Sequence, residues 1–412
     1  MPKSNRKALI FLMITVSLDS LGLGLIVPII PELMNELTGR QGLSHAIIWG
    51  GLLMTLFAAA QFFCAPVLGN LSDAYGRRPV LLISLAALGV DYILTGLAPS
   101  IIWLFAGRLI AGMLSSTYGV ANAYVADISS GAQRGKFFSY LGAAWGFGFI
   151  LGPAVGGILG EYSIRLPFFC AAALSLANAL YGYLVLPETL SDKNRRAFSW
   201  RRANTIASLR AVATYPAVLT LLFAVLFFQI AHDTLPATWS YFTILQLQWS
   251  SGEIGYSLAA VGLLNIFVMA ILSPYLIVKI GEIKTAKIGM ILASIGFSGL
   301  SSAQNTWQFY AWLIPWSAMG LVMPSIRTLM SRQVPANAQG ELQGAISSIM
   351  GLTAVFTPIT ATQIFHYFSA DTGGVYYPGA AFVLAALAMG CAFMMILLST
   401  RKLLATQTSH SG

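Results

Sequence analysis

Residues 46–79 read AIIWGGLLMTLFAAAQFFCAPVLGNLSDAYGRRP, an apolar run that ends at residue 70 and leads into a short loop with two arginines. A hydrocarbon core about 30 Å thick needs roughly 20 helical residues to cross, so this run is long enough to span a membrane. The whole chain is 57% hydrophobic and only 9% charged, against about 25% charged for a soluble domain. Because irregular backbone cannot face lipid, the sequence predicts an all-α membrane protein with twelve transmembrane helices. The predicted spans are 8–30, 46–70, 79–98, 101–125, 137–160, 165–186, 217–241, 254–278, 285–303, 308–328, 342–365 and 376–399.

The basic residues predict the orientation of the chain. If the N-terminus is cytoplasmic, all but three of the 23 Lys and Arg residues fall on the cytoplasmic side. Arg40 and Arg165 fall on the other side, and Arg108 lies within a span. Positive loops stay inside, so we expect a multi-pass protein of a bacterial cytoplasmic (inner) membrane with both termini cytoplasmic.

Several classes of protein are disfavoured by the same pattern. The net charge of +9 comes from basic residues scattered over separate loops, so we expect lipid as a partner and no nucleic acid. The three cysteines, Cys64, Cys170 and Cys391, have no metal spacing and are expected in the core. No loop is long enough for a soluble catalytic domain, and neither a G-x-S-x-G elbow nor a nucleotide loop occurs. We therefore expect no enzyme, no bound metal and no cofactor.

The chain reads as two halves of six spans each. A polar stretch near the midpoint predicts an N-terminal bundle over 1–190, a cytoplasmic linker over 191–215 and a C-terminal bundle over 216–412. An offset of 205 positions aligns turn-forming residues of the two halves, as expected for a duplicated six-helix repeat of a transporter with a binding site between the bundles. The aligned pairs are Pro31 with Pro236, Gly76 with Gly281, Gly135 with Gly340, and Pro153 with Pro358.

The loop after the second span, GNLSDAYGRRP over 69–79, is the most specific motif. It resembles the G-x-x-x-D-x-x-G-R-[RK] signature of the major facilitator superfamily, and with the preceding QFFCAP over 61–66 it looks like the tetracycline-efflux family. Ala74 departs from that family, which usually has Arg there. The resemblance implies a cytoplasmic gate; the alternative is a loop that serves topology and turn formation alone. The predicted gate comprises Gly69, Asp73, Gly76, Arg77, Arg78, Asp127 and Arg134.

The fifth span contains GFILGPAVGG over 148–157. Small residues at every fourth position allow close helix packing, and a proline within the helix removes a backbone donor and kinks it. The full pattern is similar to the signature of drug:proton antiporters of the superfamily and implies export. Its residues are Gly148, Gly152, Pro153, Gly156 and Gly157.

Three charged residues within the first four spans are candidates for proton coupling. Asp19 lies near the middle of the first span, where a carboxyl group is expensive to ionise and is a candidate for reversible protonation. Arg108 must have acceptors to persist inside a bilayer, and the resembled superfamily associates its R-x-x-x-G element with proton coupling. Asp91 matches a family acid that binds substrate or proton, or it hydrogen-bonds Tyr92. For Asp19 and Arg108 the alternative is a purely structural bond between helices.

The second half departs from the tetracycline-efflux pattern. The His and Asp of that family correspond to Asn265 and Ala293, neither of which titrates. His232 and Asp233 in the seventh span are candidates to replace the missing proton site, or they lie solvated at the outer mouth. The departure argues against tetracycline, with its bound divalent cation, as the substrate, and leaves the antiporter class unaffected.

The sequence therefore predicts a proton-coupled antiporter that exports a small amphipathic compound, tetracycline-like or related. The alternatives are a dedicated metabolite or siderophore exporter of the same fold and, from another class, a membrane enzyme or sensor. Protons are the coupling ion, and a divalent cation is expected only as part of the substrate. Single polar or aromatic residues in a span are also common core residues. The expected cavity residues are Gln61, Asn122, Gln229, Trp239, Asn265 and Gln343, with Gln333, Tyr92, Phe228 and Trp316 beside them.

Overall fold

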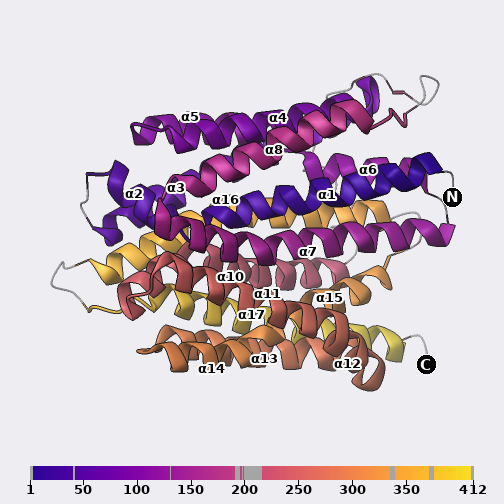
Figure 1. The fold of residues 1–412 in the computed structure, drawn as a ribbon. Helices are drawn as coiled ribbons and strands as arrows, with labels where there is room; N and C mark the ends of the chain where they lie inside the picture. Colours follow the sequence, from indigo (N-terminus) through magenta and orange to yellow (C-terminus); the bar gives the residue numbers. More distant parts are fainter. Residues whose placement is uncertain are drawn as a thin grey trace. The chain divides into compact units, whose positions relative to one another are not determined.

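The computed structural model describes residues 3–39, 42–129, 131–190, 195–196, 198, 216–334, 339–370 and 375–409 (Figure 1). Within these ranges the chain is helical, without a strand, and twelve helical stretches are long and apolar enough to cross a membrane. The predicted all-α membrane fold with twelve spans is confirmed. Most of the predicted linker 191–215 lies outside the described residues.

The first six spans are built from eight helices. Their bounds are α1 Lys3–Ile26, α2 Ile30–Leu37, α3 Leu43–Tyr75, α4 Arg77–Gly96, α5 Ile101–Leu114, α6 Thr117–Ile128, α7 Gly131–Tyr162 and α8 Leu166–Val185. The last six spans are built from α10 Pro216–Leu247, α11 Ser251–Phe267, α12 Ser273–Ile280, α13 Glu282–Ser301, α14 Thr306–Ser317, α15 Val322–Ser331, α16 Gln339–Ser369 and α17 Ala380–Ser409.

Three spans change their helical geometry in the middle. The fourth span breaks between α5 and α6 at Ser115 and Ser116. The eighth span passes through a π-helical segment over Val268–Leu272, and the tenth through a 3-10 segment over Ala318–Leu321. Such interruptions leave local backbone groups free of the regular helical ladder and are frequent at functional sites.

The chain forms two compact units. The N-terminal unit comprises residues 1–49, 56–204 and 249–262, and the C-terminal unit comprises 50–55, 205–248 and 263–412. Two short segments therefore belong to the unit of the other half of the chain, a feature that the predicted division into continuous bundles does not contain. Small residues make both placements possible, because Gly255 of α11 packs against Gly157 of α7, and Gly51 of α3 packs against Thr362 of α16.

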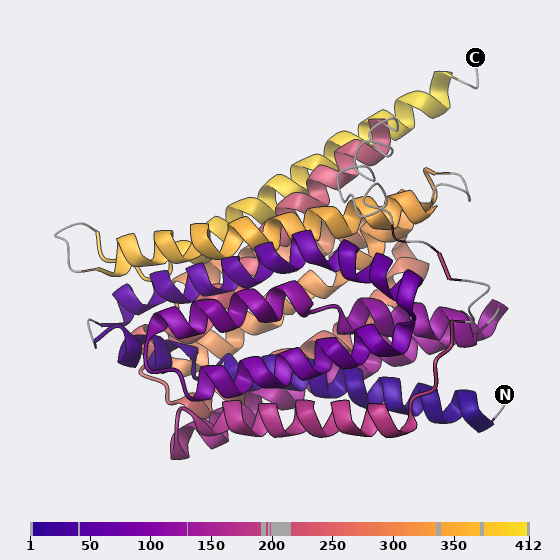
Figure 2. The ribbon, with the colours of Figure 1, turned by 90° about the horizontal axis from the view of Figure 1, so that it is seen from above.

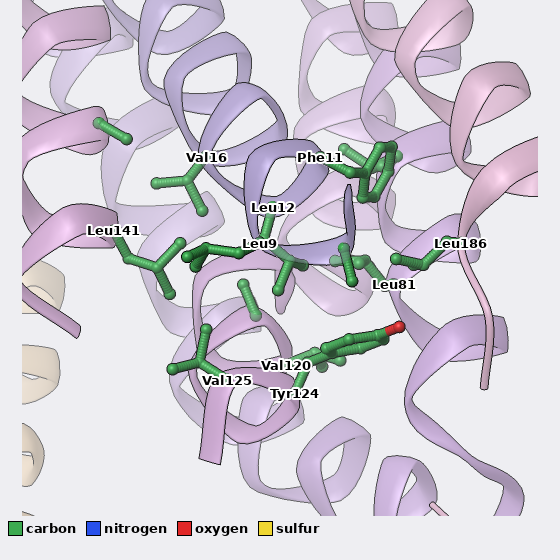
Figure 3. Close-up of a cluster of buried hydrophobic side chains, with 14 of the residues drawn as sticks. Leu9, Phe11, Leu12, Val16, Leu81, Val120, Tyr124, Val125, Leu141 and Leu186 are labelled. Carbon is green, nitrogen blue, oxygen red and sulfur yellow. The ribbon is translucent and has the colours of Figure 1, made fainter. Parts of the chain in front are cut away.

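The core of the N-terminal unit is aliphatic. Helix α1 packs along α7 and α8, and α4 packs on α8 and α5. Side chains from five helices and from Leu186 meet in one cluster (Figure 3), in which Leu12, Tyr124 and Leu141 are fully buried. This cluster fixes the ends of the helices that carry the loop with the two arginines.

The core of the C-terminal unit is aromatic. Helix α10 packs on α16 and α17, and Figure 2 shows it beside α17, the yellow helix that ends at the C-terminus. Trp239 of α10 is fully buried and meets Phe309 edge to face, with ring centroids 4.9 Å apart. Phe242, one turn later, contacts Phe382 of α17 at the same centroid distance. Offset and edge-to-face aromatic pairs have a preferred geometry and stabilise a core by more than the buried area alone would.

Two glycines at equivalent positions of the two halves, Gly76 and Gly281, both adopt a positive φ angle. Gly76 and Gly281 join consecutive spans with φ angles of 111° and 81°. A positive φ of this size disfavours any residue with a Cβ, so both turns require glycine. Pro153 and Pro358 each lie inside a helix, whereas Pro31 begins α2 and Pro236 lies within the continuous α10.

Candidate functional site

Asp19 lies near the middle of α1, half-buried, and its carboxyl group accepts a hydrogen bond from the hydroxyl of Thr117. Thr117 is the first residue of α6, directly after the break in the fourth span. No described cation forms an ion pair with Asp19 within 4 Å. Asp19 therefore has a neutral hydrogen-bond partner, and its side chain is partly exposed.

Arg108 and Asp91 form a buried ion pair between α5 and α4. Arg108 Nη2 lies 3.1 Å from Asp91 Oδ2, without the alignment of a hydrogen bond. Asp91 is 1% exposed, and Gly107 leaves room for it because a methyl group there would lie 2.7 Å from Asp91 Oδ1. The Arg108 guanidinium also lies over the rings of Phe57 and Tyr92, at 5.9 and 5.8 Å from their centroids. Burial is thus tolerated because the cation has an anion and two aromatic faces.

Tyr92 connects this pair to Asp19. Its buried hydroxyl lies within electrostatic range of Arg108, Asp19 and Asp91. It forms no hydrogen bond with a described residue, and a methyl group at Gly22 of α1 would lie 2.8 Å from it. The structure therefore gathers all three predicted proton-coupling residues of the first half around one tyrosine.

The motif of the fifth span is a packing surface for α1. A methyl group at Gly152 would lie 2.6 Å from the carbonyl oxygen of Leu21 and 2.8 Å from Gly24 Cα, and Pro153 packs on Gly24. Gly148 and Gly156 likewise face the backbone of α1. Two hydroxyls of α1 bond the backbone of α7, since Ser17 donates to Ala144 O at 2.8 Å and Ser20 to Trp145 O at 2.7 Å. Gly157 faces α11 instead, so the motif serves two neighbours.

The predicted gate is an ionic cluster around Arg77. Its guanidinium pairs with Asp73 one turn earlier and with Asp127 of α6, the latter at 3.1 Å. The same group donates to Ser72 Oγ at 3.1 Å. Arg78 points elsewhere and donates to the carbonyl of Tyr183 at 2.6 Å. The side chain of Arg134 lies outside the described residues, and Gly69 has open space where a Cβ would be.

Glu188 holds this loop and was missed in the sequence. Its carboxylate accepts from the backbone N–H groups of Arg77 at 3.0 Å and Arg78 at 3.1 Å, the first residues of α4. It also accepts from its own neighbours Thr189 and Leu190. An acid at a helix N-terminus satisfies orphan donors and complements the dipole. The one signal in the sequence was an acid directly after the sixth span, far from α4 along the chain.

In the C-terminal unit, Gln229, His232 and Asp233 form a cluster on α10. Gln229 Nε2 donates to Asp233 Oδ1 at 2.7 Å and lies 3.3 Å from His232 Nδ1, which is 3.0 Å from the same Asp233 oxygen. The side chains of adjacent helical residues leave the helix axis in directions about 100° apart. His232 and Asp233 therefore meet because of their side-chain rotamers, not because of the backbone. The cluster lies in the middle of the span Val218–Leu247, not at its end.

The remaining predicted cavity residues have diverse environments. Trp239 is fully buried in the aromatic core described above, so its packing is that of a core residue. Gln61 is half-buried and donates to Ser115 Oγ at the break of the fourth span, at 3.2 Å. Asn122 donates to the carbonyl of Tyr118 within its own helix, at 2.9 Å. Asn265 is half-buried just before the π-helical segment, and Gln343 is exposed in the first turns of α16.

Among the described residues, no group of three His, Cys, Asp or Glu side chains could hold a metal ion.

Known proteins match this chain over most of its length. The family model described as Major Facilitator Superfamily matches residues 12–358 and 221–411. The class C tetracycline resistance protein of Escherichia coli is 34% identical over 386 residues, covering 93% of this chain and 96% of the relative. The class B protein of Escherichia coli is also 34% identical, over 95% and 96% of the two chains. A solved bacterial homologue of the human lysosomal transporter Spinster is 14% identical and superimposes with a TM-score of 0.80, covering 97% of this chain and 98% of that one. The chain therefore belongs to the Major Facilitator Superfamily, alongside the tetracycline resistance proteins.

Proposed function

We propose that the protein is a proton-coupled antiporter that exports a small amphipathic drug, tetracycline or a related compound, across the bacterial cytoplasmic membrane. Relatives that are 34% identical over nearly the whole chain are tetracycline resistance proteins, which supports a drug as the substrate. The twelve spans and the excess of basic residues in alternate loops support a cytoplasmic location of both termini.

The observation that carries the proposal is the position of Asp19. It is half-buried in the middle of a span, bonds a neutral hydroxyl and has no described cation as a direct ion-pair partner. Asp91, by contrast, is sealed and paired with Arg108. Asp19 is therefore the proton carrier of the N-terminal unit. Arg108 couples the charge state of Asp19 to neighbouring helices through Tyr92, which interacts electrostatically with both Arg108 and Asp19.

Energy from the proton gradient is sufficient for export. One elementary charge crossing 100 mV releases about 2.3 kcal/mol, equivalent to a roughly fiftyfold concentration ratio before any pH difference contributes. One or two protons per drug molecule therefore support substantial accumulation outside the cell.

The cluster of Asp73, Arg77 and Asp127 acts as the cytoplasmic gate in this proposal. Its ionic bonds connect the end of α3 with α6, and a conformational change of the loop must break or rearrange them. Asp73→Asn should abolish transport without preventing insertion in the membrane; normal transport by this variant would refute the role.

The decisive experiment measures proton flux in proteoliposomes that contain a pH-sensitive dye, with tetracycline and Mg²⁺ added outside. Asp19→Asn should eliminate the drug-dependent proton flux, because the amide cannot bind and release a proton. Glu32→Gln is the matched control, since Glu32 lies exposed in the short helix α2, and it should keep the flux. Undiminished flux in Asp19→Asn would reject Asp19 as the carrier.

A further inference from the structure

The cluster on α10 presents one ring nitrogen with two incompatible neighbours. His232 Nδ1 lies 3.3 Å from the amide nitrogen of Gln229, a donor, and 3.0 Å from Asp233 Oδ1, an acceptor when ionised. A neutral Nδ1 that accepts from Gln229 cannot also bond Asp233, and a protonated Nδ1 that donates to Asp233 opposes the Gln229 donor.

The orientation of the Gln229 amide is fixed independently of the histidine. Its Nε2 is 2.7 Å from Asp233 Oδ1, and rotating the amide by 180° would place two acceptor oxygens at that distance. The presence of a proton on His232 Nδ1 therefore decides between two hydrogen-bond patterns within one helical turn.

We propose that Gln229, His232 and Asp233 form a second proton-binding site, in the C-terminal unit, that binds one proton per transport cycle. This inference rests on the proposed proton-coupled export. In the unloaded state the ring of His232 is neutral and carries its proton on Nε2. On loading, Nδ1 takes a second proton from a hydronium ion, an N–H bond forms, and water is released, while Nε2 keeps its proton. Asp233 stays ionised, so the net charge of the cluster changes from −1 to zero. On release the N–H bond breaks, and the amide of Gln229 again donates to the ring nitrogen.

The surroundings of the cluster suit reversible proton binding. The His232 side chain is 55% exposed, whereas that of Asp233 is 14% exposed. A His–Asp pair facing hydrocarbon would be costly, and ionisable residues in spans face protein or water. Asp233 Oδ2 is buried and accepts no hydrogen bond from a described residue. The acid therefore keeps an unused acceptor that stabilises a positive charge nearby.

The backbone beside the cluster can adapt to the change. Pro236 follows four residues after His232 and has no amide hydrogen, so the carbonyl of His232 loses its usual helical donor. Phe228, one turn before His232, stacks on the imidazole, with the two ring centroids 6.2 Å apart. Because the backbone at His232 lacks one helical hydrogen bond, it can adjust when the His232 side chain shifts.

Neighbouring helices contribute few charges. Helices α15, α16 and α17 pack on α10. Arg327 of α15 contacts the sulfur of Met350 at 3.8 Å, and Arg332, just after α15, pairs with Glu282 at 2.6 Å. The other titratable groups with described side chains on these three helices are His366, Tyr367 and Cys391.

The first experiment observes the proton directly and requires no transport. The chain has only four histidines, so full-length protein labelled with ¹⁵N-histidine in lipid vesicles gives few imidazole signals. His232→Gln assigns the signal by its loss. We expect the signals to show Nδ1 of His232 without a proton in the unloaded state, and both ring nitrogens protonated in the loaded state. Asp233→Asn should move the midpoint to lower pH because the ring loses its anion. Gln229→Leu should move it to higher pH because neutral Nδ1 loses its donor.

The second experiment counts protons. Drug and proton fluxes are measured together in proteoliposomes at a clamped potential, with tetracycline and Mg²⁺ as the probe. His232→Gln should lower the ratio by one proton per drug molecule while transport continues, and His366→Gln is the control that should leave it unchanged. An unchanged ratio in His232→Gln, or a ring that keeps one protonation state over the whole pH range, would overturn the second site. Loss of flux in Asp19→Asn together with either of these results leaves the proposed function intact.

Discussion

Glu188 offers the sharpest test of how the cytoplasmic loop is held. Its Oε1 accepts from the N–H groups of Arg77, Thr189 and Leu190 at 2.9–3.0 Å, and its Oε2 accepts from Arg78 at 3.1 Å. In Glu188→Gln the amide oxygen can replace Oε1, but the amide nitrogen then opposes the N–H of Arg78. The variant loses one charge-assisted bond and the favourable interaction of the acid with the N-terminus of α4.

The magnitude follows from these bonds. A hydrogen bond to a charged group contributes about 1.5–3 kcal/mol, and an anion at a helix N-terminus about 0.3–1 kcal/mol. Glu188 is half-buried, so solvent replaces part of the loss, and we expect a destabilisation of about 2 kcal/mol. For a cooperative unit of roughly 200 residues this lowers the thermal midpoint by about 4–8 °C.

The assay is thermal unfolding of purified full-length protein in detergent, followed by tryptophan fluorescence. Glu32→Gln again serves as the control, because it removes an exposed acid from the first turn of α2. A Glu188→Gln midpoint equal to that of the wild type would refute the capping of α4. Glu188→Asp should be about as unstable as Glu188→Gln, since the shorter aspartate side chain cannot reach the N–H groups of both Arg77 and Arg78.

Two further changes test the packing and the buried charges of the N-terminal unit. Gly152→Val should cost about 1–3 kcal/mol by overpacking, because the backbone at Leu21 cannot yield, whereas Gly146→Ala, with open space around it, should be neutral in the same unfolding assay. Asp91→Asn should cost about 3–5 kcal/mol because the Arg108 charge loses its anion. Adding Arg108→Gln should restore part of the stability, and a double variant worse than the single one would contradict the pairing.

The sequence by itself determined the spans of this protein. Each membrane helix satisfies its backbone hydrogen bonds within its own segment, so local composition is sufficient to predict it. The turn at Gly76 is also predictable, because its need for a positive φ is a local property. The small residue Gly152 and the neighbouring Pro153 likewise predict that α7 packs closely against another helix. The motifs at residues 69–79 and 148–157 likewise indicate the superfamily without any knowledge of contacts between helices.

Only the tertiary structure decided which side chains meet. Arg108 needed an acceptor, but its choice of Asp91 depends on the packing of α5 against α4. Glu188 reaches α4 across more than a hundred residues of chain, and no pattern in the sequence encodes that distance. Trp239 belongs to an aromatic core because α10 turns that face towards Phe309. Contacts between segments depend on packing and rotamers, which periodicity and composition do not specify.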